Sequence, residues 1–261
     1  MLMSAGHAAT VGDMTRQITI GVLTPHATAG PDAEFPLMAS GRVRTAVSRI
    51  GLPVLPGSDH REPPTSPDGM RALVTPAAVD EAASALPGPF EALAVASTGL
   101  GYALGHDAES ALLQRLRARW DVPVCGTSPS AVSALRSHRV KRISLVHPPW
   151  FGRAQNRLGA EYFRSQGFEV VEAQLADLPD DPDRIEPAMV VEWASQHVSP
   201  RAEAVVIGGN GFRAAGAIHE LEDAIGRLVL EANQVLLWSV LIEAGVSLDI
   251  RGFGALFDAL E

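Results

Sequence analysis

Short apolar runs alternate along this sequence with longer amphipathic segments, and this alternation limits the fold more than any other feature. Four β-branched or apolar runs that end in Gly, Pro, Ser or Thr predict strands at residues 17–23, 92–96, 142–146 and 204–207. Helical patterns between and after these runs predict helices at residues 77–85, 107–120, 128–138, 156–166, 187–197, 214–221 and 231–244. Such alternation predicts an α/β fold with parallel sheets that helices cover on both faces.

Two parts of the chain resemble each other. The strand, loop and helix pattern of residues 93–105 is similar to that of residues 204–216, and both have a Gly-rich loop after the strand. We therefore predict two similar Rossmann-like halves, each a short parallel sheet flanked by helices, related by a pseudo-two-fold axis with the site between them. The predicted parts are a disordered leader at 1–16, an N-terminal half at 17–130, a C-terminal half at 131–250 and a tail at 251–261 that packs back.

Composition excludes several classes of protein. The chain has 21 Lys and Arg against 30 Asp and Glu, and its net charge of −9 has the wrong sign for binding the phosphates of a nucleic acid. A single cysteine allows neither an internal disulfide nor a Cys-cluster metal site. The apolar runs are shorter than the ~20 residues that cross a bilayer. Residues 1–16 lack the pattern of a secretory signal. We therefore expect a cytoplasmic chain with no nucleic-acid partner and no membrane span.

The ends of the predicted strands mark a candidate ligand site. In parallel sheets, ligands bind in the crevice beyond the carboxyl ends of the strands, which brings together the loops at 25–35, 97–102, 147–153 and 208–213. The Ser-Thr-Gly and Gly-Gly-Asn-Gly sequences in two of these loops offer backbone N–H groups and hydroxyls to an anion. Both loop sequences are equally consistent with tight strand-to-helix turns that need glycine. Neither matches a P-loop or a dinucleotide fingerprint, and no metal-binding His pair is present. We therefore expect no metal ion and no organic cofactor.

Two histidines adjoin prolines at strand ends. His26 and His147 could each transfer a proton near neutral pH, although a histidine in such a loop is more often a hydrogen-bonded bystander. Asp32 and Glu34 lie in the same loop as His26, where acids are usually solvated. Cys125, between short apolar residues, has the pattern of a small buried hydrophobe rather than that of a reactive thiol.

Further motifs run through most of the chain. They include Ile-Gly-Val-Leu-Thr-Pro at 20–25, the patterned segment 123–143, and Ala-Asn-Gln at 232–234 followed by Trp238. Together they resemble the maleate cis-trans isomerase and arylmalonate decarboxylase family, within the aspartate/glutamate racemase superfamily. The resemblance implies a cofactor-independent lyase or isomerase whose partner is a small carboxylate substrate.

The resemblance also bears on the single cysteine. Racemases and isomerases of this superfamily use two cysteines that face each other across the crevice, whereas the decarboxylases keep only the second one. The corresponding positions here are Ser97 and Gly209, so the resemblance implies a member that lacks both thiols. A serine hydroxyl acts as a nucleophile only when a neighbouring base such as His26 activates it. We therefore expect a non-cysteine mechanism, in which a carboxylate cradle holds an enolate or oxyanion. Gly209 would also leave space for a bulkier substrate.

These considerations select the candidate site residues. The candidates for proton transfer are Ser97, His26, His147 and Tyr102. The candidates for substrate binding, among which the resemblance implies that Thr98 donates to the substrate carboxylate, are Thr28, Thr98, Gly99, Trp150, Asn156, Gly209, Asn210 and Gly211. Two alternatives stay open, namely a carboxylate-binding relative that has lost catalysis and a hydrolase or ring-opening enzyme with a His-activated water. The apolar segment 229–244 indicates a subunit contact in a homo-oligomer.

Overall fold

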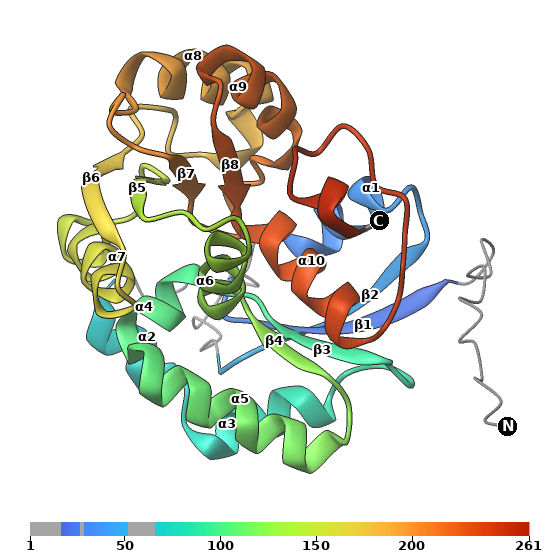
Figure 1. Cartoon of the computed structure of the whole chain (residues 1–261). Coiled ribbons are helices and arrows are strands. Elements are labelled where there is room, and N and C mark those ends of the chain that lie inside the picture. The colour runs from blue at the N-terminus through green and yellow to red at the C-terminus, as the bar shows by residue number, and fades with distance from the viewer. Residues whose placement is uncertain (1–16, 27–28, 52–65, 261) are drawn as a thin grey trace, which may run out of the picture.

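The computed structural model describes residues 17–26, 29–51 and 66–260, which form two parallel four-stranded sheets (Figure 1). The first sheet has the order β2-β1-β3-β4 and consists of β1 (Ile18–Thr24), β2 (Val43–Arg49), β3 (Ala92–Val95) and β4 (Val124–Gly126). The second has the order β6-β5-β7-β8 and consists of β5 (Arg142–His147), β6 (Glu169–Leu175), β7 (Ala204–Ile207) and β8 (Leu228–Glu231). The shared strand order confirms the prediction of two similar α/β halves. The predicted leader lies outside the described residues.

Helices flank both sheets. The first half contains α1 (Pro31–Met38), α2 (Pro67–Leu73), α3 (Pro76–Ser84), α4 (Thr98–Leu104), α5 (His106–Trp120) and α6 (Thr127–Ser137). The second contains α7 (Arg153–Ser165), α8 (Pro187–His197), α9 (Ile218–Ile225) and α10 (Ala232–Glu243). Short 3-10 turns form η1 (Pro182–Arg184), η2 (Ala215–Ala217) and η3 (Phe257–Leu260). Among the described helices, none combines the length and the apolar composition that a bilayer crossing requires.

The predicted loop at 25–35 is too long, because α1 begins at Pro31. We predicted a loop here because the segment follows a predicted strand, and its prolines are unfavourable in a helix interior. Pro31, however, occupies the first turn of α1, where its missing N–H costs nothing, and Pro36 is tolerated near the end of this short helix. Phe35 and Met38 are buried and fasten α1 to the first sheet. The loop is therefore shorter than predicted, and a helix follows it.

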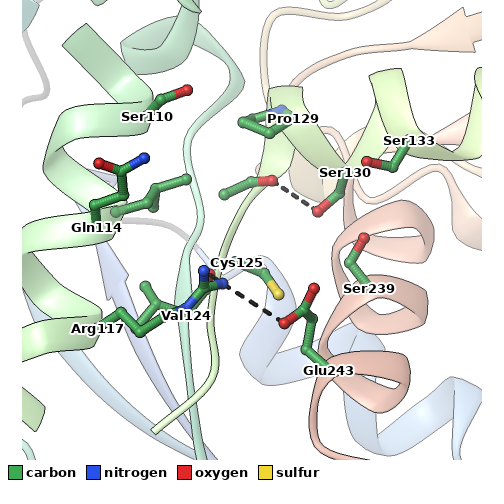
Figure 2. A pocket seen from close by; sticks show the side chains of 12 residues that line it. Ser110, Gln114, Arg117, Val124, Cys125, Pro129, Ser130, Ser133, Ser239 and Glu243 are labelled. Atoms are coloured by element: carbon green, nitrogen blue, oxygen red, sulfur yellow. Dashed lines mark hydrogen bonds and ion pairs between the residues drawn. The ribbon is translucent and has the colours of Figure 1, made fainter. Parts of the chain in front are cut away.

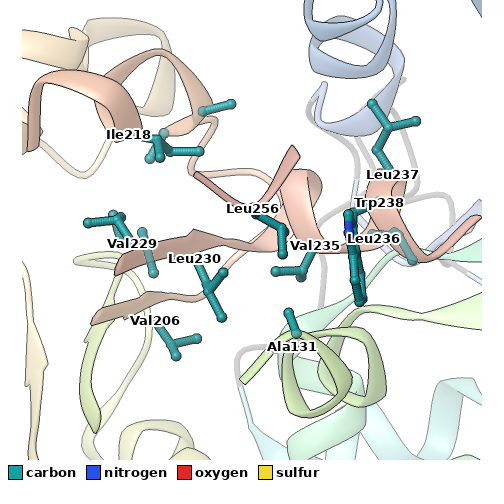
Figure 3. Close-up of a cluster of buried hydrophobic side chains, with 14 of the residues drawn as sticks. Ala131, Val206, Ile218, Val229, Leu230, Val235, Leu236, Leu237, Trp238 and Leu256 are labelled. Carbon is teal, nitrogen blue, oxygen red and sulfur yellow. The ribbon is translucent and has the colours of Figure 1, made fainter. Parts of the chain in front are cut away.

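The two halves share one hydrophobic core. Helices α6 and α10 lie between the sheets (Figure 1), and Figure 3 shows Val206 and Leu230 of the second sheet near Ala131 of α6 and Val235 of α10. Residues 232–241 of α10 are all buried, which explains why this helix is apolar on every side. Residues 229–231 belong to β8 rather than to a helix. Burial within the chain thus accounts for the apolar segment 229–244, which is no evidence for a subunit contact.

The predicted domain limits fall at identifiable places in the structure. The division between residues 130 and 131 lies inside α6, which starts directly after β4. In the last part of the chain, Leu256 and Phe257 join the shared core, and the backbone carbonyl of Phe253 accepts a hydrogen bond from Nε2 of Gln234 at 2.7 Å. Side-chain packing and one partly buried hydrogen bond therefore hold this segment against α10.

A buried acid contributes to the contact between the halves. Glu109 of α5 accepts a hydrogen bond from the Tyr162 hydroxyl of α7, at 2.7 Å from Oε2. Burial raises the pKa of Glu109 to about 8, although the bond from Tyr162 acts in the opposite direction. The carboxyl group also lies against α4, because a Cβ at Gly101 would be 2.6 Å from Oε1 of Glu109. Neutral Glu109 therefore suits this contact better than the carboxylate does.

Glu109→Gln is expected to stabilise the protein at alkaline pH. Between the ordinary pKa of 4.5 and about 8, folded Glu109 holds a proton that the unfolded chain has lost. Its contribution to folding therefore falls as pH rises through this window, by about 1.4 kcal/mol per pH unit. Urea unfolding at pH 5, 7 and 9 should show the variant gaining on the parent as pH rises. The same substitution at the exposed Glu161 is the control, and parallel curves for Glu109→Gln and the parent would contradict the prediction.

Candidate active site

Ser97 and His26 meet at the carboxyl ends of two adjacent strands. Ser97 follows β3 and caps α4, where its Oγ accepts the N–H of Leu100 at 3.1 Å. The same Oγ lies 3.3 Å from Nε2 of His26, which follows β1. Burial, and next the Arg49 guanidinium, lower the pKa of His26 to about 4. His26 is therefore neutral at pH 7 and can accept the Ser97 proton at Nε2. The sequence predicted both residues, and the structure brings them together.

Arg49 adds a positive charge to this edge of the first sheet, and the sequence analysis missed it. It is the last residue of β2 and pairs in register with Thr24 at the end of β1. Its Nη2 lies 3.9 Å from Oδ2 of Asp32 in the first turn of α1. The available signal was the content of Val and Thr at positions 43, 45 and 47, which are spaced two apart as in a strand.

Thr98 and Asn210 connect the two halves beside Ser97. The Oδ1 atom of Asn210 accepts the N–H of Thr98 at 3.0 Å and its hydroxyl at 3.3 Å. It also accepts the hydroxyl of Thr127 at 3.2 Å. In return, the N–H of Gly209 donates to Oγ1 of Thr98 at 2.9 Å. All these groups are buried. The Thr98 hydroxyl is thus engaged within the protein, and its implied bond to a substrate carboxylate stays a prediction.

His147, Tyr102 and Asn156 form a separate buried cluster. Nδ1 of His147 lies 2.7 Å from Oδ1 of Asn156, and its Nε2 lies 3.1 Å from the Tyr102 hydroxyl. The ring stacks on Phe151 and is completely buried. Burial lowers the His147 pKa to about 4, whereas the bond to Asn156 raises it. Nδ2 of Asn156 donates to the carbonyl of Ala173 at 3.0 Å. Both ring nitrogens of His147 therefore have hydrogen-bond partners within the protein, which is typical of a histidine with a structural role.

The two candidate glycines lie against neighbouring side chains. Gly209 has φ +98°, a conformation that favours glycine, and a Cβ there would be 2.8 Å from Cγ of Pro148. The expected extra space for a bulkier substrate is therefore absent, and a cysteine at this position would be strained. A Cβ at Gly99 would be 2.2 Å from Nε2 of Gln155. The positive φ and the rigid proline ring thus favour glycine at 209, whereas at Gly99 the neighbouring atom is the mobile end of a glutamine side chain.

Three candidates remain. Trp150 is half-buried and its ring meets that of Phe212 edge to face, with centroids 5.9 Å apart. Gly211 is buried in the loop after β7. Thr28 lies outside the described residues. Within the described parts of the chain, no three His, Cys, Asp or Glu side chains come together as a metal site requires.

Cys125 lies in a different place, a recess between α5, α6 and α10 with a volume of about 200 Å³ (Figure 2). The recess also contains the ion pair of Arg117 and Glu243, whose charged atoms are 3.6 Å apart. Burial raises the pKa of Cys125 to about 12, so the thiol is not reactive at neutral pH. Cys125 is a buried small residue, as predicted, and it belongs to the packing beside β4.

Comparison with known proteins agrees with this fold. The arylmalonate decarboxylase family matches residues 66–257. A glycine-to-cysteine variant of arylmalonate decarboxylase has a similar structure, with 21% identity, a TM-score of 0.76, and coverage of 92% of this chain and 99% of that chain. Maleate isomerase Iso from Pseudomonas putida S16 is similar at 15% identity and a TM-score of 0.72, covering 94% of this chain and 100% of that chain.

A cysteine-to-serine variant of Nocardia farcinica maleate cis-trans isomerase, with a covalently bound succinylcysteine intermediate, matches at 19% identity and a TM-score of 0.73. That match covers 92% of this chain and 98% of that chain. A comparison with curated protein sequences gives no significant match. The structural matches are below the identity at which function transfers, so they concern the fold, whereas the family match covers most of the sequence. This chain belongs to the arylmalonate decarboxylase family.

Proposed function

We propose that this protein is a lyase or isomerase that acts on a small carboxylic acid, without a bound cofactor, and uses Ser97 and His26 to move the proton. The observation that carries the proposal is the 3.3 Å separation of the Ser97 Oγ from the His26 Nε2 at the carboxyl ends of β3 and β1. Membership of the arylmalonate decarboxylase family supports the reaction class. The pair lies where parallel sheets bind their ligands.

The pair can serve both directions of proton transfer. Neutral His26 accepts the Ser97 proton, so that the O–H bond breaks and Oγ can add to a C=C bond conjugated to the carboxylate, whose π electrons move onto the carboxylate as an enolate. In the reverse direction, the proton returns from Nε2 to Oγ, or the hydroxyl protonates a substrate carbanion. The negative charge of an enolate needs nearby donors. Arg49 supplies a cation, and Gly99 lies in the first turn of α4, where N–H groups have no acceptor within the helix.

The names of the similar structures suggest the substrates to test. One group is named for arylmalonates and the other for maleate, and one maleate cis-trans isomerase carries its substrate carbons on a cysteine. Both names denote small dicarboxylates. For this chain we propose a substrate of the same class, with an oxygen of Ser97 in place of sulfur.

The direct test is a substrate screen followed by NMR in D₂O. Aryl- and alkylmalonates and maleate are incubated with the protein, and loss of CO₂, appearance of fumarate and deuterium at the α-carbon are measured. We expect turnover of at least one compound, with deuterium incorporation if an enolate forms. Compounds that raise the melting temperature yet are recovered unchanged and free of deuterium would contradict catalysis and support the binding alternative.

A serine next to a neutral histidine also favours acyl transfer, which is the second candidate function. In that reaction Ser97 attacks a carbonyl carbon while His26 takes its proton. His26 then gives this proton to the alcohol or amine that leaves, and water releases the acyl group from Oγ. Hydrolysis of p-nitrophenyl acetate, and covalent labelling by a fluorophosphonate that disappears in Ser97→Ala, would favour this function. A lack of labelling together with malonate turnover would favour the first candidate.

A further inference from the structure

Glu34 is a buried acid that accepts two hydrogen bonds from opposite sides. It belongs to α1, and its side chain is 4% exposed. Its Oε1 accepts the N–H of Ala215 at 2.9 Å, and its Oε2 accepts Nδ2 of Asn233 at 2.6 Å. Because both partners are donors, this environment requires an acceptor at each oxygen of the side chain. The acid predicted to be solvated is therefore part of the buried contact between the halves.

Asn233 links Glu34 to Asn210 through hydrogen bonds of its side-chain amide. Its Nδ2 donates to Glu34 and also to the backbone carbonyl of Asn210 at 2.8 Å. Its Oδ1 accepts Nδ2 of Asn210 at 2.9 Å. A side-chain amide has one donor end and one acceptor end. Because Glu34 accepts a hydrogen bond from the NH₂ group of Asn233, the side-chain oxygen of Asn233 must face Nδ2 of Asn210.

Asn210 in turn links Asn233 to the start of α4 through its own side-chain amide. With its Nδ2 directed at Asn233, its Oδ1 faces the first half and accepts the N–H and hydroxyl of Thr98 and the hydroxyl of Thr127. Thr98 directly follows Ser97 and is the first residue of α4. The position of Thr98 therefore constrains the serine that caps the helix.

We propose that Glu34 is a positioning residue for the reaction, because it fixes the orientation of the Asn233 and Asn210 amides and thereby holds Thr98 and Ser97 in place. This inference rests on the proposed function of Ser97. A second buried acid, Glu231, faces the same asparagine, since its Oε2 accepts the backbone N–H of Asn233 at 2.8 Å. Burial raises the pKa of Glu34 to about 7, so the experiments are done at pH 8.5, where its carboxylate form predominates.

Glu34→Gln tests the proposal with little change in shape. The new side chain has one acceptor oxygen, and its NH₂ group must face either the Ala215 N–H or Nδ2 of Asn233, both of which are donors. We expect kcat to fall by about 30-fold or more while KM changes by less than about threefold, since the reacting group is displaced rather than the binding surface. The matched control is Glu222→Gln. Like Glu34, Glu222 accepts two hydrogen bonds, but they come from the backbone N–H groups of Val229 and Ala255. Since neither belongs to the chain of contacts to Ser97, kcat should stay within about twofold of the parent.

A double variant separates positioning from a general loss of packing. In Glu34→Gln/Asn233→Asp, the new amide at position 34 donates to the new carboxylate at position 233, which still accepts Nδ2 of Asn210. The carboxylate cannot donate to the backbone carbonyl of Asn210 as Asn233 does, so the double variant is compared with Asn233→Asp, which lacks the same hydrogen bond. Asn233→Asp alone also places two carboxylates face to face, and we expect the kcat of the double variant to be at least about fivefold higher. A double variant no better than Asn233→Asp, or a kcat of Glu34→Gln within twofold of the parent, would overturn the proposal.

The side-chain amide NMR signal of Asn210 gives a readout that needs no substrate. The signal should shift in Glu34→Gln, stay in place in Glu222→Gln, and return toward the parent position in the double variant. An Asn210 signal unchanged in Glu34→Gln would overturn the inference, whatever the activity. Absence of turnover by the parent, with the expected shifts present, would instead count against the proposed function alone.

Discussion

Ser97→Ala is expected to lower kcat by about 10²–10⁴-fold, the range found when an activated nucleophile or proton donor is removed. The expected loss is large because the variant removes the hydroxyl that lies 3.3 Å from His26 Nε2. The measurement is the steady-state rate on the best substrate of the screen. Ser130→Ala is the control, because Ser130 is also buried and donates to the backbone carbonyl of Gly126, beside β4. Its kcat should stay within about twofold of the parent.

His26 should give the same phenotype as Ser97. His26→Gln is expected to lower kcat by a similar factor, and the double variant should be no slower than the slower single variant, because the two residues act as one unit. In the parent, a base with a pKa of about 4 is neutral above that value, so kcat should be lost only as pH falls through about 4. Retention of more than about a third of kcat by Ser97→Ala would contradict the assigned role.

The sequence could place Ser97 and His26 because each directly follows an apolar strand, and topology brings the ends of parallel strands together. Arg49 has the same kind of position, but the strand before it alternates Arg, Thr and Ser with apolar residues and was missed. His147 is the last residue of β5, and sequence reasoning could not reveal that its ring turns inward. The ring fits there because residue 159 is a glycine, whose Cβ would be only 2.8 Å from Cε1 of His147. This glycine is 12 positions away in the sequence, so the histidine and its neighbours do not reveal it.

The burial and the hydrogen-bond partners of the polar residues depend on contacts that sequence patterns do not encode. Glu34 was expected in solvent because prolines surround it, but its partner Asn233 is 199 positions away. Asn210 was predicted to bind substrate, and its backbone lies in the expected loop. Its side chain instead faces Thr98 and Thr127 of the other half. Sequence position thus predicted which loops meet, whereas the direction of each amide follows from donors and acceptors that the fold assembles.

Asn210→Ala is expected to lower the free energy of unfolding by about 3 kcal/mol, the largest stability effect among the site residues. The amide accepts the Thr98 N–H and two hydroxyls and donates to Asn233. Its removal leaves the buried Thr98 N–H and the Asn233 carbonyl oxygen without these partners, and a buried unsatisfied group costs about 1–3 kcal/mol. Urea unfolding measures the change. Gln17→Ala, which removes an exposed hydrogen bond to Gly41, should change stability by less than about 0.5 kcal/mol.

The position of Asn210 makes this a test of how the halves are held together. Its partners Thr98 and Thr127 start α4 and α6 of the first half, whereas Asn210 follows β7 of the second. Loss of the amide should therefore raise hydrogen exchange at the start of α4 more than in the centre of β5. Thr127→Val and Asn210→Ala share one hydrogen bond, so their effects should be less than additive. Additive effects, or a cost of Asn210→Ala below about 1 kcal/mol, would contradict a central role of this amide in the contact.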